Sequence, residues 1–266
     1  MTPSQALQRV VVRMLFDPSL VARVYAGHTP PPLSSSQAAM LRAQPRGGWA
    51  TDPYRCSRTL QALLEEYPAA AAITGVKPLH AFFRSPTFHE AIMQRRVLAA
   101  AFGDWLIPQA GPVAAFEQAV ASLRRRRPAR LGAGEVCSSA SVQPVSLLAG
   151  TVTAWQAVTA RLGVRPLERL VDPSFLPLPV PALGPDVEHW LLEVDVRGQV
   201  QLGGGSAGLN GLLLAASAPI GRASLACAAL ELGADSVAEA RGLIDDLIVE
   251  GLLVGAARLE GVEQEA

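Results

Sequence analysis

Prolines divide the first half of this sequence into segments too short for long helices. Several of the 21 prolines follow a residue that caps helices, as in Thr2-Pro3, Asp17-Pro18, Asp52-Pro53 and Ser85-Pro86. Proline is tolerated in the first turn of a helix but interrupts its interior. Each pair therefore predicts a helix start, and the prolines between the pairs predict helix ends.

Apolar residues recur at helical spacing between these prolines, as Leu7, Val10, Val11 and Met14 do in the first segment. We expect a loop over 28–36 and a helix that Ser36 caps and Gly47-Gly48 ends. The expected helices span 2–15, 18–24, 36–46, 53–66, 85–105 (a helix and its continuation) and 112–123, with two shorter helical pieces at 68–74 and 78–83. The first half is therefore predicted to be a bundle of about seven short helices.

The pattern changes after Pro128. We expect one or two short strands over 136–148, a helix over 151–162, and an extended connection over 172–185, which holds five prolines. A strand, a turn and a strand over 187–201 precede helices at 207–216, 223–232 and 237–249 and a last strand at 252–254. This order is typical of a winged-helix-like module.

The predicted fold class is thus α+β, with an all-helical bundle followed by a smaller winged-helix-like module of the peptide-recognition kind. The expected domains are a helical bundle at 1–130, a connecting region with short strands, one helix and a proline-rich linker at 131–184, and the module at 185–266.

The net charge of zero conceals two oppositely charged halves. Residues 1–130 hold 16 basic and 7 acidic side chains, whereas 131–266 hold 7 and 16. Such asymmetry suggests two surfaces with separate partners. A content of 50% hydrophobic and 17% charged residues excludes a disordered chain.

Three cysteines, Cys56, Cys137 and Cys227, lie far apart and form no disulfide framework or CxxC motif. The N-terminus lacks the features of a secretory signal, and the two long uncharged stretches are too polar to span a bilayer. We expect a cytoplasmic protein with no membrane contact.

Signatures of catalysis are missing. The glycine-rich loop 203–208 lacks the lysine of a P-loop, so a turn between strand and helix is preferred over a phosphate cradle. No two histidines have metal-ligand spacing, and we expect no metal or cofactor in this chain. His80 and His89 are expected on helix surfaces, and Cys227 on a buried helix face. The chain is predicted not to be an enzyme.

Two features carry candidate interactions. The arginines Arg124, Arg125, Arg126, Arg127 and Arg130 end the last helix of the basic half, where they either remain solvated or dock an acidic partner. The predicted recognition helix 237–249 lies in a region, 222–255, with 2 basic and 6 acidic residues, which would repel a DNA duplex. A winged helix without basic residues is suited instead to binding a peptide by β-augmentation.

The basic half resembles a family. The matching segments read YRCSRTLQALLEEYPAAAAITG, LHAFFRSPTFHEAI, AAAFGDWL and AAFEQAVASLRR. They are similar to the helical partner subunits of multinuclear non-haem iron oxygenases, a family that includes the partner of methanobactin oxazolone synthase. The resemblance covers about residues 1–170, and the second half resembles peptide-recognition elements by layout alone.

This resemblance implies a non-catalytic subunit that binds the leader of a ribosomally made precursor peptide and docks on an iron oxygenase, which carries the iron and modifies the core peptide. The basic bundle with its arginine run would face the enzyme. The leader would add as a strand near the predicted hairpin edge and rest on the apolar stripe of helix 237–249. The expected peptide-binding residues are Leu191, Leu192, Glu193, Val194, Asp195, Val196, Ile244, Leu247 and Ile248.

The same residues would form core packing if no peptide binds. A second hypothesis is a winged-helix transcriptional regulator that binds DNA. A third, a hydrolase that depends on Cys56 or Cys137, has the least support because neither cysteine has a histidine close in sequence.

Overall fold

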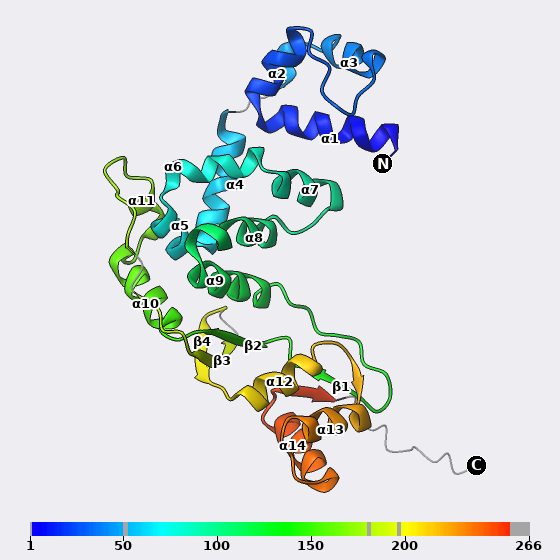
Figure 1. Ribbon diagram of the computed structural model, residues 1–266, viewed down its shortest axis with the longest axis vertical. Coiled ribbons are helices and arrows are strands. Elements are labelled where there is room, and N and C mark those ends of the chain that lie inside the picture. Colours follow the sequence, from blue (N-terminus) through cyan, green and yellow to red (C-terminus); the bar gives the residue numbers. More distant parts are fainter. Residues whose placement is uncertain (1, 50–52, 180–181, 196–197, 256–266) are drawn as a thin grey trace, which may run out of the picture. The chain divides into compact units, whose positions relative to one another are not determined.

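The computed structural model describes residues 2–49, 53–179, 182–195 and 198–255. In these ranges the chain is a mixed α+β protein with most of its helices in the first half and two small antiparallel sheets in the second (Figure 1). It divides into two compact units. The helical unit comprises Met1–Gln118 and Val152–Ala182, and the mixed unit comprises Ala119–Thr151 and Leu183–Ala266. The segment 131–184, expected to connect two domains, is therefore shared between the units.

The described residues before position 130 form nine α-helices, close to the bundle of short helices that the prolines predict. They are α1 (Pro3–Phe16), α2 (Pro18–Tyr25), α3 (Ser35–Arg42), α4 (Pro53–Glu66), α5 (Pro68–Thr74), α6 (Val76–Leu79), α7 (Pro86–Gln94), α8 (Leu98–Ala110) and α9 (Pro112–Leu123), with 3-10 turns η1 (Arg46–Gly48) and η2 (His80–Arg84).

Capping side chains set several of these helix starts. Thr2, Asp17 and Ser85 cap α1, α2 and α7, as expected from the sequence. The Asp17 carboxylate accepts hydrogen bonds from the backbone N–H groups of Ser19 at 3.1 Å and Leu20 at 3.2 Å. These hydrogen bonds satisfy N–H groups that have no partner within the helix.

Several boundaries were predicted wrongly. Helix α3 ends at Arg42 and not at Gly47-Gly48, and the segment expected as one helix over 78–83 is the end of α6 followed by η2. Ser34, not Ser36, caps α3, because Gln37 lies three residues after Ser34 and completes a capping box with it. The helix expected over 85–105 is interrupted at Arg95, which has a left-handed φ of 54° and separates α7 from α8.

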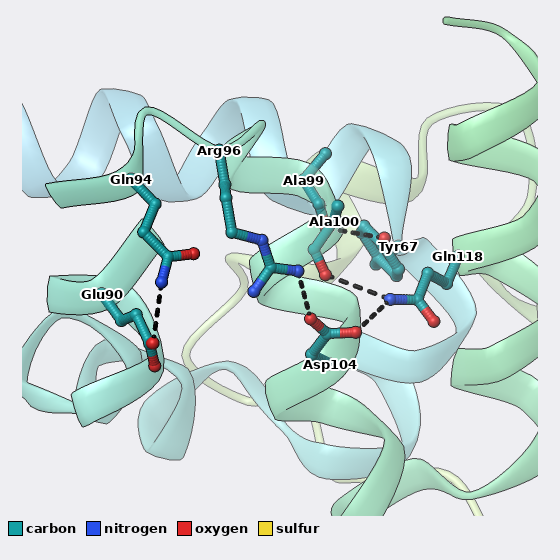
Figure 2. Close-up of polar contacts among 8 residues, drawn as sticks. All are labelled: Tyr67, Glu90, Gln94, Arg96, Ala99, Ala100, Asp104 and Gln118. Atoms are coloured by element: carbon teal, nitrogen blue, oxygen red, sulfur yellow. Dashed lines mark hydrogen bonds and ion pairs between the residues drawn. The ribbon is translucent and has the colours of Figure 1, made fainter. Parts of the chain in front are cut away.

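Polar contacts connect the start of α8 to α9 (Figure 2). The Arg96 guanidinium forms an ion pair of 2.7 Å with Asp104 on α8. The Gln118 amide on α9 donates to the other Asp104 oxygen at 2.6 Å and to the backbone oxygen of Ala100 at 3.1 Å. Close to Gln118, the buried Tyr67 hydroxyl donates to the Ala99 oxygen at 2.7 Å. These contacts fix α8 between its neighbours.

Aromatic side chains form the core of the helical unit. Phe82 is fully buried, and its ring centroid lies 5.0–5.7 Å from those of Phe83, Phe88, Phe102 and Trp105. Most of these ring pairs are edge-on or tilted, the arrangement that aromatic quadrupoles favour. The residues come from η2, α7 and α8, so the cluster holds three consecutive elements together.

A buried carboxylate joins α9 to α5 and to the later helix α10 (Thr151–Leu162). The Glu117 oxygens accept hydrogen bonds from the backbone N–H groups of Ala69 and Ala70 at 2.9 Å each and from the Trp155 indole at 3.2 Å. Burial raises the pKa of Glu117 to about 7, and these hydrogen bonds act in the opposite direction. A short helix not expected from the sequence, α11 (Pro166–Leu170), follows α10.

The mixed unit contains two three-stranded sheets and three helices. The strands are β1 (Glu135–Ser138), β2 (Val142–Leu148), β3 (Val187–Val194), β4 (Val200–Gly204), β5 (Ile220–Gly221) and β6 (Leu253–Gly255), and the helices are α12 (Ala207–Ala215), α13 (Arg222–Glu231) and α14 (Val237–Val249). The strand orders are β5-β1-β6 and β2-β3-β4. All pairs in both sheets are antiparallel.

One hydrophobic core serves both sheets and the three helices. It includes Val136 of β1, Val142 of β2, Leu213 of α12, Leu225 of α13 and Ile244 of α14. Because β1 and β2 contribute to this core, the unit requires strands from before the proline-rich segment, which composition alone did not indicate.

Candidate functional site

The strand predicted to accept a peptide is the central strand of its sheet. Residues Leu191, Leu192, Glu193 and Val194 lie in β3, which pairs with β2 on one side and with β4 on the other. Both edges of these residues are therefore occupied, and the predicted strand edge is wrong. Asp195 lies in the β3–β4 turn, and Val196 lies outside the described residues.

The outer edge of β2 is covered. Ser141 and Ala149, at the two ends of β2, form backbone hydrogen bonds with Val194 and Asp186. Odd-numbered residues therefore bond to β3, and the N–H and C=O groups of even-numbered residues of β2 point away from it. Pro144 has no N–H to offer at this edge, and the Val142 oxygen accepts a hydrogen bond of 2.9 Å from the Arg126 guanidinium. Proline and a charged side chain are common means of blocking an edge strand.

The outer edge of β4 is open among the described residues, since β4 pairs with β3 alone. The Asp195 N–H donates to the Gln199 oxygen, and the Gly205 N–H donates to the His189 oxygen, at 2.9 Å each. The N–H and C=O groups of odd-numbered residues in and next to β4 therefore point toward β3. Val200, Leu202 and Gly204 therefore turn their N–H and C=O groups outward. Such a row of groups is a template for an added strand.

Helix α14 presents a different face from the one predicted for binding. Ile244 and Leu247 are buried in the core of the mixed unit, and Ile248 is half-buried against it. These residues are correctly placed on one stripe, but the stripe packs against α13 and the sheet instead of meeting a ligand. The exposed side of the helix carries Leu243, which is 41% exposed.

A groove of about 580 Å³ lies along this exposed side of α14. Its α14 wall consists of Glu239, Gly242, Leu243 and Asp246, which share one face at intervals of three and four residues. The opposite walls come from the start of α12 and the end of α13. These include Ser206, Gly208, Leu209, Leu212, Leu232 and Ala234.

The groove is lined by the buried side chains of Leu212 and Ala229 and by two exposed acidic residues, Glu239 and Asp246. The Glu239 carboxylate also accepts a hydrogen bond of 2.7 Å from the Asp235 N–H. The groove starts at Ser206, two residues after the open strand β4 ends. The open edge and the groove are thus consecutive along the chain. Together they could accept an extended segment whose apolar side chains enter the groove and whose basic side chains meet its acidic residues.

Gly242 leaves room in this groove. A Cβ atom at this position would find no atom within 4 Å, so packing does not require glycine here. Because glycine in a helix interior costs about 0.8–1.0 kcal/mol relative to alanine, we predict that Gly242→Ala raises the free energy of unfolding by about that amount. Urea unfolding followed by circular dichroism measures the change. A lower stability than the wild type would contradict the open environment.

The arginine run is only partly available to a partner. Arg126 is half-buried and donates to the backbone oxygens of Val142 at 2.9 Å and Ser217 at 3.3 Å, and Arg125 donates to the Ala121 oxygen at 2.7 Å. Arg124, Arg127 and Arg130 are exposed. All five belong to the mixed unit, not to the helical unit in which they were expected. Arg126 is therefore a structural residue.

Two further side chains differ from expectation. Cys227 is exposed, because the buried face of α13 consists of Leu225, Ala226 and Ala229. His89 is buried on α7 instead of lying on a surface. Burial lowers the pKa of His89 to about 4, and the positive charge of Arg13 contributes to that shift. His89 is therefore neutral near pH 7.

The glycine-rich loop has a structural role. Gly203 and Gly204 belong to β4, and Ser206 caps α12 by accepting a hydrogen bond from the Leu209 N–H at 3.1 Å. Within the described ranges, no three histidine, cysteine or acidic residues lie close enough together to hold a metal ion.

None of the helices in the described part of the chain has the length and apolar character needed to cross a membrane. No protein-family model matches the sequence, and a comparison with curated proteins finds no match.

Proposed function

We propose that this chain is a non-catalytic partner subunit. In this proposal it binds the leader of a ribosomally made precursor peptide and presents the core peptide to a multinuclear iron oxygenase. The leader adds as a strand to the outer edge of β4, and its side chains enter the groove of α14. The proposal rests on one observation above all, the open edge of β4, which is followed two residues later in the chain by the first residue of a partly apolar groove lined by Glu239 and Asp246.

The order of elements in the mixed unit supports a winged-helix interpretation. From α12 to β6 the order is helix, strand, helix, helix, strand, and β1 lies between β5 and β6. In this view β6 is the first strand after the last helix, and β1, from earlier in the chain, takes the place of the second strand that pairs with it.

The alternative, a DNA-binding regulator, is less compatible with the charges. The exposed face of α14 holds Glu239 and Asp246, and Arg222 is engaged by Asp245 in an ion pair of 2.6 Å. A duplex approaching this helix would meet negative charge, whereas phosphate neutralisation needs positive charge. A steeply salt-dependent shift of duplex DNA in a gel would favour the regulator and contradict the proposal.

The exposed arginines Arg124, Arg127 and Arg130 are the proposed contact with the oxygenase. Co-purification of the chain with an iron oxygenase encoded beside it tests this docking. In a charge-reversed variant of these three arginines, we expect loss of co-purification without loss of leader binding. Retention of the complex would exclude these side chains from the interface.

A pair of substitutions at Gly204 tests the strand edge. The Gly204 N–H points outward and a Cβ atom there meets nothing within 4 Å, so alanine meets no neighbour and proline removes no ladder hydrogen bond to β3. We predict that Gly204→Pro weakens binding of a labelled leader peptide about tenfold or more, because it removes a donor and blocks the approach of a strand. Gly204→Ala is the matched control and keeps the affinity.

Fluorescence anisotropy measures both affinities, with circular dichroism as the check of folding. Equal binding by the two variants would place the peptide elsewhere. If neither variant nor the wild type binds a leader peptide from a precursor encoded nearby, the proposed function fails.

A further inference from the structure

A cavity of about 810 Å³ lies within the helical unit, apart from the peptide groove. Its walls come from α4, from the junction of α5 and α6, and from α11 with the loop that follows it. Most of the lining is apolar, including Leu60, Leu64, Leu170 and Phe175. Small-molecule sites commonly have about 300–1,000 Å³ and an apolar lining with a few polar groups.

The loop wall of this cavity is fixed to the helices. The Leu178 N–H donates to the Ala72 oxygen at 2.8 Å. Gly75 has a φ of +80°, and a Cβ atom there would lie 3.0 Å from the Pro177 ring. Glycine at this position thus permits both the turn between α5 and α6 and the close approach of the loop. The cavity is therefore bounded by defined contacts.

Some polar groups that line the cavity have hydrogen-bond or ion-pair partners among the described residues, and others have none. Glu168 pairs with Arg165 at 3.1 Å, and Asp172 accepts hydrogen bonds from the Ser174 N–H at 2.8 Å and the Ser174 hydroxyl at 2.6 Å. Lys77, the single lysine of the sequence, has no ion pair or hydrogen bond with the residues that the structure describes.

The Thr74 hydroxyl oxygen is buried and has no hydrogen-bond partner among the described residues. A buried hydroxyl without a partner is costly, so such groups normally bind a ligand, water or protein group. At the mouth of the cavity Val171 and Leu176 are 58% and 78% exposed. The site thus combines an apolar interior, an apolar mouth, an exposed lysine and a buried hydroxyl, the last two without polar partners in the described part of the chain.

We propose that this cavity binds an amphipathic carboxylate, such as a medium-chain fatty acid. The hydrocarbon chain occupies the apolar interior, and the carboxylate accepts hydrogen bonds from the Lys77 ammonium and the Thr74 hydroxyl. The cavity and the groove of α14 belong to different units, so binding at each can be tested separately.

Displacement of a dansyl-labelled undecanoic acid tests the proposal, with decanoate and decanol as competitors. Decanoate should compete about tenfold or more better than decanol, because hydrogen bonds to a charged carboxylate are stronger than those to a neutral hydroxyl. In Lys77→Gln the affinity for decanoate should fall about tenfold while that for decanol stays unchanged. Thr74→Val, close in shape, should weaken decanoate to a smaller extent.

A variant that fills the cavity completes the design. Gln61 lines the cavity from an exposed position on α4, so Gln61→Trp should abolish binding of both competitors without unfolding the chain. Equal affinities of wild type for decanoate and decanol, or an unchanged decanoate affinity in Lys77→Gln, would overturn the proposal. So would absence of probe binding, which would leave the cavity to water or to a protein partner. Each result is read without the leader peptide, so it is distinct from failure of the proposed function.

Discussion

Replacing Glu117 by alanine is expected to destabilise the chain by about 3–5 kcal/mol, because a buried group that accepts several hydrogen bonds disappears. The N–H groups of Ala69 and Ala70 and the Trp155 indole would all lose their acceptor, and a cavity would remain beside Trp155. Chemical unfolding followed by tryptophan fluorescence measures the loss. A change below about 1 kcal/mol, the typical net contribution of one hydrogen bond, would show that water replaces the carboxylate.

Glu117 also predicts a dependence of stability on pH. The carboxyl group loses its proton near 4.5 in the unfolded chain but near 7 in the folded chain. Between these values the folded state binds more protons, so the free energy of unfolding falls as the pH rises from about 4.5 to 7. At about 1.4 kcal/mol for each pKa unit, this contribution amounts to a few kcal/mol.

Glu117→Gln is the control for this effect, because glutamine has nearly the same shape and does not titrate. The difference in unfolding free energy between the wild type and this variant should change with pH across the same window. The comparison is necessary because His89, whose pKa is lowered to about 4, contributes the opposite slope between about 4 and 6.5. A difference that is constant with pH would show that Glu117 stays ionised throughout.

The second large effect is expected from two neighbouring residues of α14. Ile244 is 1% exposed and Leu243 is 41% exposed. We predict that Ile244→Asn lowers the free energy of unfolding by about 3–5 kcal/mol, because it leaves a cavity and buries an amide without partners. Leu243→Asn should lower it by less than about 1 kcal/mol, since only helix propensity and partial burial are lost.

Of these two substitutions, the one with the smaller effect on stability should have the specific effect on leader binding. Leu243→Asn removes an apolar side chain from the proposed groove and should weaken a labelled leader peptide about tenfold, while the fold remains intact. Urea titration and fluorescence anisotropy on both variants separate the two roles. If Leu243→Asn unfolds the chain as readily as Ile244→Asn, the exposed side of α14 is covered by something other than a peptide.

Helix starts were readable from the sequence because they depend on nearby residues. Thr2, Asp17 and Ser85 each cap the helix that begins next to them, and the expected strands at 136–148 and 187–201 are present. The error at Ser36 has the same local basis, since two serines compete and only Ser34 has a glutamine three residues later. The helix break at Arg95 could not be predicted from the sequence pattern, because arginine rarely adopts the left-handed conformation that it has here.

The candidate site could be predicted only in part. The sequence identified the hairpin and helix α14, which are present, but the predicted strand β3 is central in its sheet and the predicted residues Ile244 and Leu247 are buried in the core. Strand order depends on which distant segment pairs with the hairpin, and β2 joins β3 across nearly forty residues of intervening chain. Periodicity shows that Ile244 and Leu247 share a stripe, but an apolar stripe fits a core and a ligand equally well.

By itself the sequence determined the succession of short helices, the capped starts, the opposite charges of its two halves and the presence of a hairpin. These follow from local backbone preferences and from counting side chains. The tertiary structure alone decided that β3 is central and β4 open, that Arg126 closes an edge, and that Glu117 and His89 are buried. Each depends on contacts between residues far apart in the chain, for which hydrophobic pattern and propensity contain no partner information.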